Sequence, residues 1–362
     1  MINNFKGAIT SIGFNSVCGT GQNAYYELVH TLPSEKKIST YDPEGFLGTK
    51  GIRFLNNATL MYCNLAFQCI SNRNLGAKII AEADKIGLYD GSDLSNIEDG
   101  FIFDLTAKMD GPALVSPMSA PNTIANASSS MMAIKSTIKG PNFTVCGGAC
   151  GSLQALDIAL LHLSENMIDC AIVGSTEITS RYHQAVRQGE LRGEAQEQDA
   201  PEMGIAFSIE SLENAQKQGT EILGTILGVH SGQKLRKETS EGLLIRLCSQ
   251  LLKQTDLSSE QLDGLILSAG SHCIDEVIFK KQVNEKINPD LAIIYPESVH
   301  GYGDNAGGFA GMLFGIGLFN QKIKNNLPSL RIDGTPKESY KHLIIATIDR
   351  TGYGIVTLLK KA

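Results

Sequence analysis

The chain has 362 residues, a length that predicts one large domain or two fused halves, and its 42% hydrophobic and 19% charged residues are typical of a globular protein. A net charge of -7 excludes the basic surface on which nucleic-acid binding depends. With no bilayer-length apolar run and no signal-peptide pattern at the N-terminus, we expect a cytoplasmic protein that does not bind membranes.

The first part of the chain predicts alternating strands and helices. Lys6–Gly13 alternates small and β-branched residues and predicts a strand, and the apolar spacing of Asn23–Leu32 predicts a helix. Tyr41–Asn56 is polar and rich in glycine, which indicates a surface loop. Ala58–Ile70 has helical periodicity and predicts the next helix.

The middle of the chain places a cysteine on a sharp turn. Asn142–Cys146 is a short β-prone run with Gly-Pro before it and Gly-Gly after it, which predicts a strand. The following LQALDIALLHL segment carries four leucines on one helical face. Cys150 falls between the two, and Cys170–Gly174 predicts another buried strand.

The second half repeats this organisation. Leu262–Leu267 and Leu291–Tyr295 predict strands, and a glycine-rich stretch from Gly301 opens a helix that runs through Phe319. His342–Ile348 and Gly354–Leu359 predict a final strand pair. Strands and helices alternate throughout and no Pro- or Ser-rich linker separates the halves, so we predict an α/β fold packed as one unit.

Eight cysteines are scattered along the chain, and none forms a Cys-x-x-Cys pair. We therefore expect neither a zinc site nor a redox dithiol, and no other metal site is indicated. Most of these cysteines are expected to be small buried hydrophobic residues.

Cys150 is the exception because of its position. A thiol in the first turn of a helix lies near the positive end of the helix dipole and near free backbone N–H groups, which favours the thiolate and lowers its pKa. The same N–H groups can polarise a thioester carbonyl. The alternative is a plain packing role, because many buried cysteines lie near the start of a helix.

Several segments resemble β-ketoacyl synthases. GPNFTVCGGACGSLQAL, residues 140–156, is similar to the nucleophile segment of that family. The segments Ile9–Asn23, Met203–Gly228 and Ser298–Gly317 are similar to the family's first strand and turn, its strand–helix–strand before the second half, and its second-histidine loop and helix. The resemblance implies a thiolase-like fold of two similar βαβαβ-type halves, layered α-β-α-β-α, with residues 1–210 carrying the cysteine turn and residues 211–362 carrying the histidine loops.

Condensing enzymes of this family use a cysteine, two histidines and a lysine. Aligned with these motifs, the chain places Ala269 at the first histidine, Tyr302 at the second and Glu297 at the lysine. The C-terminal turn that contributes to the family's oxyanion hole is reduced to Gly352–Val356. Loss of one donor to a developing enolate costs on the order of 10²–10³ in rate, and a phenol with a pKa near ~10 is a poor proton shuttle.

Two histidines lie near the altered positions. His272 follows the Ala269 position by three residues, and His300 precedes Tyr302 by two. Each would need a shifted loop to face Cys150, so we expect surface or interface histidines. The alternative is an active β-ketoacyl-acyl carrier protein synthase or acyltransferase that uses Cys150 with His272 or His300.

The departures resemble those of chain length factors of type II polyketide synthases, whose Gly-rich turn is similar to Gly147–Gly151. The resemblance implies an acyltransferase-class subunit that is inactive in condensation on its own. Its partners would be a ketosynthase, in a heterodimer or a dimer of heterodimers, and an acyl carrier protein that supplies phosphopantetheine; no cofactor of its own is implied. Many chain length factors carry glutamine at the position of Cys150, which here could accept an acyl group or fill space.

The same resemblance places Pro117–Met132 against the partner's active site. Small or flexible residues at Met118, Ser119, Ala120 and Ala125 predict room for a long chain growing on the partner. The alternative is a plain helix packed by small residues. A further possibility is a stand-alone acyl-binding protein, a relic of a condensing enzyme. For the product of the favoured ketosynthase pair, we expect an aromatic polyketide rather than an aryl polyene.

Overall fold

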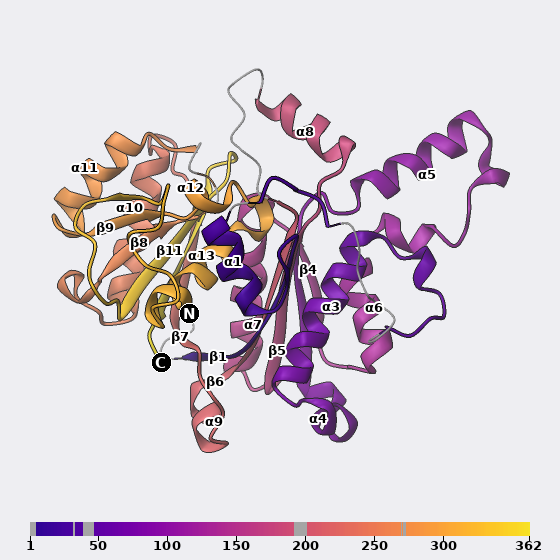
Figure 1. The fold of residues 1–362 in the computed structure, drawn as a ribbon, viewed down its shortest axis with the longest axis horizontal. Helices are drawn as coiled ribbons and strands as arrows, with labels where there is room; N and C mark the ends of the chain where they lie inside the picture. The colour runs from indigo at the N-terminus through magenta and orange to yellow at the C-terminus, as the bar shows by residue number, and fades with distance from the viewer. Residues whose placement is uncertain (1–4, 32, 39–46, 192–200, 269, 271–272) are drawn as a thin grey trace.

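The computed structural model describes residues 5–31, 33–38, 47–191, 201–268, 270 and 273–362. Within these residues twelve strands join into one sheet, and helices cover it (Figure 1). The strands are β1 (Gly7–Ser16), β2 (Gly19–Thr20), β3 (Ile86–Ser92), β4 (Asn142–Cys146), β5 (Cys170–Glu177), β6 (Met203–Ser211), β7 (Gly224–Gln233), β8 (Gly264–Leu267), β9 (Ala292–Tyr295), β10 (Arg331–Asp333), β11 (His342–Ile348) and β12 (Tyr353–Lys360).

The α-helices of the described residues range from one turn to more than four. They are α1 (Gln22–Thr31), α3 (Asn57–Asn72), α4 (Gly76–Ala81), α5 (Ile97–Met109), α6 (Ala127–Ser136), α7 (Gly151–Ser164), α8 (Arg181–Leu191), α9 (Leu212–Lys217), α10 (Ser240–Gln254), α11 (Glu276–Lys286), α12 (Glu297–His300) and α13 (Asp304–Phe319).

The sheet contains the same five-strand pattern twice. In the first half β4, β3 and β5 are parallel, and β6 and β1 follow antiparallel. In the second half β9, β8 and β11 are parallel, and β12 and β7 follow antiparallel. The two patterns join where β1 pairs with β7. This repetition confirms the predicted α/β fold of two similar halves, whereas the exact boundary at residue 210 stays a prediction.

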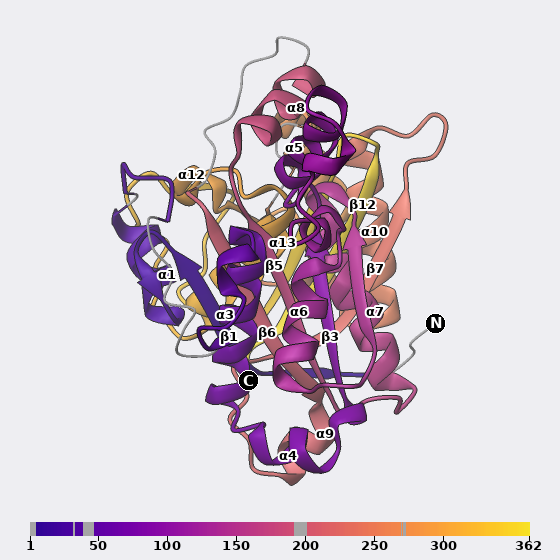
Figure 2. The same ribbon diagram turned by 90° about the vertical axis from the view of Figure 1, so that its right-hand side faces the viewer.

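The helices lie in layers on the two halves of the sheet. α7 contacts β3 and β5, α13 contacts β5 and β11, and the two helices also contact each other between the halves. α3 and α6 cover the outer face of the first half, and α10 covers the outer face of the second (Figures 1 and 2). Every residue of α13 is buried, as expected for a helix that is apolar on all sides.

Glycine allows the two central helices to approach closely. A Cβ atom on Gly308 of α13 would lie 2.7 Å from Cγ of Leu153 in α7. Because the cysteine turn precedes α7 and the second-histidine loop precedes α13, this contact brings the two functional segments to the same end of the molecule.

The predicted elements are confirmed over most of their length. The strands at Asn142–Cys146 and His342–Ile348 have the predicted bounds, and the predicted helix after Cys150 is α7. Of the loop predicted at Tyr41–Asn56, residues 41–46 lie outside the described residues, and Ile52–Phe54 forms a 3-10 turn. β4 lies at the edge of the sheet, with half-buried and exposed residues.

Candidate functional site

Cys150 lies on the predicted turn between a strand and a helix. β4 ends at Cys146, a 3-10 turn covers Gly148–Cys150, and α7 begins at Gly151. The backbone N–H of Cys150 donates to the carbonyl of Gly147 at 3.1 Å. Gly148 has a φ of +53°, in the left-handed region that glycine adopts without strain. These features confirm the turn that the sequence predicts.

The environment of the thiol corrects its predicted pKa. Cys150 is completely buried, and its Sγ donates to the backbone carbonyl of Tyr353 at 3.6 Å. Burial raises the pKa of Cys150 well above its ordinary value, and the nearby Asp349 raises it further. The prediction of a lowered pKa is therefore wrong, because loss of hydration outweighs the helix dipole. At neutral pH the group is a thiol.

A pocket of about 930 Å³ opens beside the cysteine turn. The small residues Gly147, Gly148 and Ala149 line one side of the pocket, and Tyr302 and Tyr353 add aromatic residues to the lining. Charged side chains complete the lining: Asp93, Asp304, Asp349, Arg187 and Arg350. Carboxylates outnumber guanidinium groups around this pocket.

Tyr302, which the sequence resemblance aligns with the family's second histidine, lines this pocket. The ring is buried against Ala149, the neighbour of Cys150, and the hydroxyl donates to Oδ1 of Asp304 at 3.3 Å. Burial raises the pKa of Tyr302 well above its ordinary value, and Asp304 and Glu297 add to the increase. The hydroxyl therefore stays protonated at physiological pH.

Of the two other aligned positions, Ala269 and Glu297, only Glu297 lies within the described residues. Glu297 is the half-buried first residue of α12. Ala269 and His272 lie outside the described residues, so their predicted roles stay predictions.

His300 corrects the expectation of a surface or interface histidine. It is completely buried, with Nδ1 2.7 Å from the carbonyl oxygen of Gly301 and its ring 6.3 Å from the ring of Tyr25. Burial lowers the pKa of His300 to about 4, so the imidazole is neutral and weakly basic.

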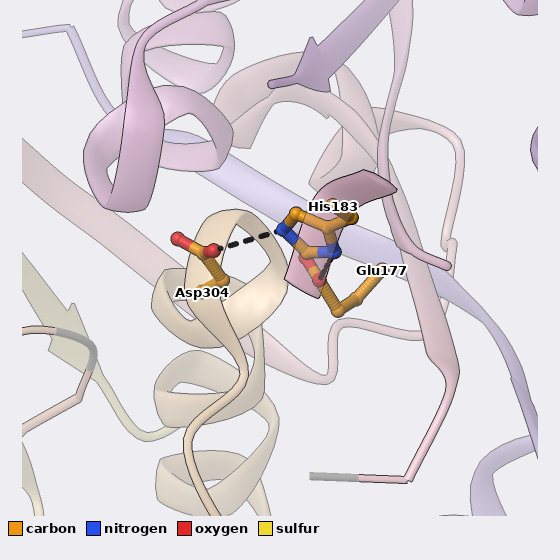
Figure 3. A group of neighbouring side chains, drawn as sticks. All are labelled: Glu177, His183 and Asp304. Carbon is orange, nitrogen blue, oxygen red and sulfur yellow. Dashed lines mark ion pairs between the residues drawn. The ribbon is translucent and has the colours of Figure 1, made fainter. Parts of the chain in front are cut away.

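A buried charged cluster adjoins Tyr302 and was missed by the sequence analysis (Figure 3). His183 on α8 lies between two carboxylates: Nδ1 is 3.5 Å from Oε1 of Glu177, and Nε2 is 3.5 Å from Oδ2 of Asp304. Nε of Arg187 is 3.6 Å from the same oxygen of Asp304. The residues come from β5, α8 and the start of α13, so no short sequence motif indicates the cluster. Only Asp304, two residues after Tyr302, could have been suspected.

The cluster has the residue types of a metal site. One ligand atom from each of Glu177, His183 and Asp304 lies within 4.8 Å of the others, and imidazole with carboxylates suits several divalent cations. The carboxylates face different ring nitrogens of His183, however, and Arg187 also lies at Asp304. The geometry is therefore that of a chain of ion pairs, in which three buried polar groups and the half-buried Arg187 satisfy one another.

The strip predicted to face a partner is not one helix. Ser119 precedes a 3-10 turn at Ala120–Thr123, and α6 covers only Ala127–Ser136. Met118 is exposed, and Ser119, Ala120 and Ala125 are half-buried. A plain helix thus describes only the end of the strip, and its role in a tunnel stays a prediction.

Comparisons with known proteins find similarity to one family. Residues 26–201 match the model of the β-ketoacyl synthase N-terminal domain. A chloroplastic 3-oxoacyl-[acyl-carrier-protein] synthase I from Arabidopsis thaliana is 24% identical over 346 residues, covering 79% of this chain and 71% of the relative. The chain is thus similar to the β-ketoacyl synthase family over its N-terminal half, and its fold is thiolase-like.

Solved structures of this family agree in fold along the whole chain. The ishigamide ketosynthase/chain length factor aligns with a TM-score of 0.81 and 15% identity, covering 99% of this chain and 100% of that one. A type II polyketide synthase acyl carrier protein in complex with its ketosynthase, AntDE:AntF, aligns with a TM-score of 0.79 and 14% identity, again covering 99% and 100%. At these identities the likeness concerns the fold alone. In the described part of the chain, no helix is long and apolar enough to cross a membrane.

The burial of Cys150 predicts slow alkylation. Iodoacetamide at pH 7.5 should modify Cys150 at least tenfold more slowly than the exposed Cys146, because it reacts with an accessible thiolate. Peptide mass spectrometry over a time course measures both rates, and Cys146→Ser assigns the fast site. Labelling of Cys150 as fast as a free thiol would contradict its buried, protonated state.

The burial of His300 predicts a loss of stability in acid. Its pKa is about 4 in the folded chain and near ~6.5 when unfolded, so between these pH values the unfolded chain binds more protons. This group therefore lowers the free energy of unfolding as pH falls from ~6.5 to ~4, by up to about 3 kcal/mol.

Urea unfolding of wild type and His300→Gln at pH 7 and pH 5 tests this effect. The decrease in unfolding free energy between the two pH values should be smaller in the variant, because glutamine does not titrate. Equal decreases in both proteins would show that His300 is not responsible.

Proposed function

We propose that this chain is a non-condensing, chain-length-factor-like partner of a ketosynthase in type II polyketide biosynthesis, in the cytoplasm. One observation carries the proposal: the residue at the second-histidine position is a phenol whose proton is directed to Asp304. Condensation by this family needs a donor aimed at the enolate of the extender unit, and removal of one such donor costs on the order of 10²–10³ in rate.

The state of the thiol supports the same proposal. A condensing nucleophile must accept an acyl group at neutral pH, which favours an exposed thiol with a lowered pKa. Cys150 is buried with a raised pKa. The retained cysteine then fills space at the turn.

The free edge of the sheet supports the proposal of a protein partner. β4 is the last strand on its side, and an unpaired strand edge in a soluble protein is normally covered or blocked by charges. Phe143 on this strand is 43% exposed, and Ile134 on the neighbouring α6 is 70% exposed. We assign this surface, β4 with α6, to the ketosynthase subunit, in a heterodimer or a dimer of heterodimers.

Two similar solved structures also favour this assignment. One is a ketosynthase/chain length factor, and the other contains a ketosynthase with an acyl carrier protein. We therefore propose an acyl carrier protein as the second partner and the source of phosphopantetheine. Within the pair, the small residues around Ser119 would leave space for a long chain on the ketosynthase, with an aromatic polyketide as the favoured product.

A second candidate is an active 3-oxoacyl-acyl carrier protein synthase that uses Cys150 with His300 or His272. The chloroplastic relative with that name favours it. The buried, weakly basic state of His300 argues against its part in such a site.

If Cys150 does not condense, removing its sulfur should leave the pair active. Assembled with a type II ketosynthase and an acyl carrier protein, Cys150→Ala should form polyketide at a rate within twofold of wild type. The matched control is the nucleophile cysteine of the ketosynthase, whose replacement by alanine should abolish product. A loss of more than tenfold in Cys150→Ala, with the pair still assembled, would favour the second candidate.

If β4 and α6 contact the ketosynthase, a charge on Phe143 should separate the pair. Phe143→Asp should weaken association at least tenfold, because a carboxylate would be buried without a partner. Val277→Asp is the control, since Val277 is 80% exposed on α11, on the other half of the molecule. Size-exclusion chromatography with light scattering measures the assembly. A stable homodimer that does not exchange with the ketosynthase would contradict the assignment.

A further inference from the structure

Asp304 is the common partner of three side chains around the pocket, through one hydrogen bond and two ion pairs. Oδ1 accepts the Tyr302 hydroxyl at 3.3 Å. Oδ2 lies 3.5 Å from Nε2 of His183 and 3.6 Å from Nε of Arg187. Figure 3 shows the carboxylate at the start of α13 pointing toward His183, with Glu177 at the other side of the ring.

The three donors have little freedom to turn toward a ligand. The guanidinium carbon of Arg187 lies 4.6 Å from the centre of the Tyr302 ring, so the two side chains also hold each other through a cation–π contact. The second ring nitrogen of His183 faces Glu177. Asp304 is 7% exposed, and a carboxylate this deeply buried normally persists only with such partners.

These contacts determine which hydrogen-bond donors are available to a ligand beside Tyr302. A carboxylate ligand has only acceptor atoms, so it requires donors from the protein. Here the Tyr302 proton and the nearest groups of His183 and Arg187 are directed to Asp304. Among the remaining charged residues of the lining, two carboxylates, Asp93 and Asp349, outnumber the one guanidinium group, Arg350, so the local charge also disfavours an anion.

We propose that Asp304 is a specificity-determining residue, which makes this pocket bind a neutral acyl thioester and reject a carboxylate-bearing one such as a malonyl thioester. The inference rests on the proposed function, which makes acyl thioesters the ligand class. It goes further by assigning the discrimination to a residue outside the family's cysteine, histidine and lysine positions.

Asp304→Asn tests the proposal directly. Asparagine keeps the shape of the side chain but removes its charge and adds an N–H₂ donor, so the donors held by Asp304 become available to a carboxylate. The probes are non-hydrolysable amide analogues of acetyl-pantetheine and malonyl-pantetheine, and isothermal titration calorimetry measures both dissociation constants.

Wild type should bind the acetyl analogue at least tenfold more tightly than the malonyl analogue. In Asp304→Asn the two constants should differ by less than threefold, through a gain in malonyl binding that a purely structural role would not produce. Asp290→Asn, an exposed substitution outside the pocket lining, should keep the preference of wild type.

Equal or tighter binding of the malonyl analogue by wild type would overturn the inference, as would failure to bind the acetyl analogue. The two dissociation constants of the wild-type protein test the inference even if Asp304→Asn does not fold. The analogues cannot react, so a preference for malonyl contradicts only this inference. Release of CO₂ from genuine malonyl thioester would instead contradict the proposed function.

Discussion

The hydrogen bond from Tyr302 to Asp304 is the interaction on which the interpretation of this site depends. It joins the loop before α13 to the charged cluster of Glu177, His183 and Arg187, and it directs the phenol proton to Asp304. A histidine at this position would offer an N–H to a developing enolate. A phenol with a raised pKa, bonded to a buried carboxylate, offers neither a proton shuttle nor a free donor.

The fold explains why this bond lies beside a cysteine far away in the sequence. Two five-strand patterns place α7 and α13 back to back, and Gly308 allows close contact with Leu153. The starts of both helices therefore border one pocket, with Ala149 packed on Tyr302. A thiolase-like framework can thus keep its turn and pocket while the side chains around the pocket differ.

Much of the fold could be predicted from the sequence because its signals are local. Glycines and Gly-Pro bound the strand at residues 142–146, and leucine spacing marks α7. The resemblance to β-ketoacyl synthases supplied the aligned positions 297 and 302. Burial depth is a tertiary property, and this is why the pKa of Cys150 and the location of His300 were predicted wrongly. The cluster around His183 was not foreseen because its members meet only when α8 packs near α13.

Decarboxylation of malonyl-acyl carrier protein by the purified chain alone tests the central claim most directly. With a ¹⁴C label in the free carboxyl group, we expect CO₂ release no faster than in the absence of protein, because the buried thiol and the Asp304-bound phenol offer no site for the enolate. An intact ketosynthase assayed in parallel should release label. Release by this chain above background, lost in Cys150→Ala, would contradict the account.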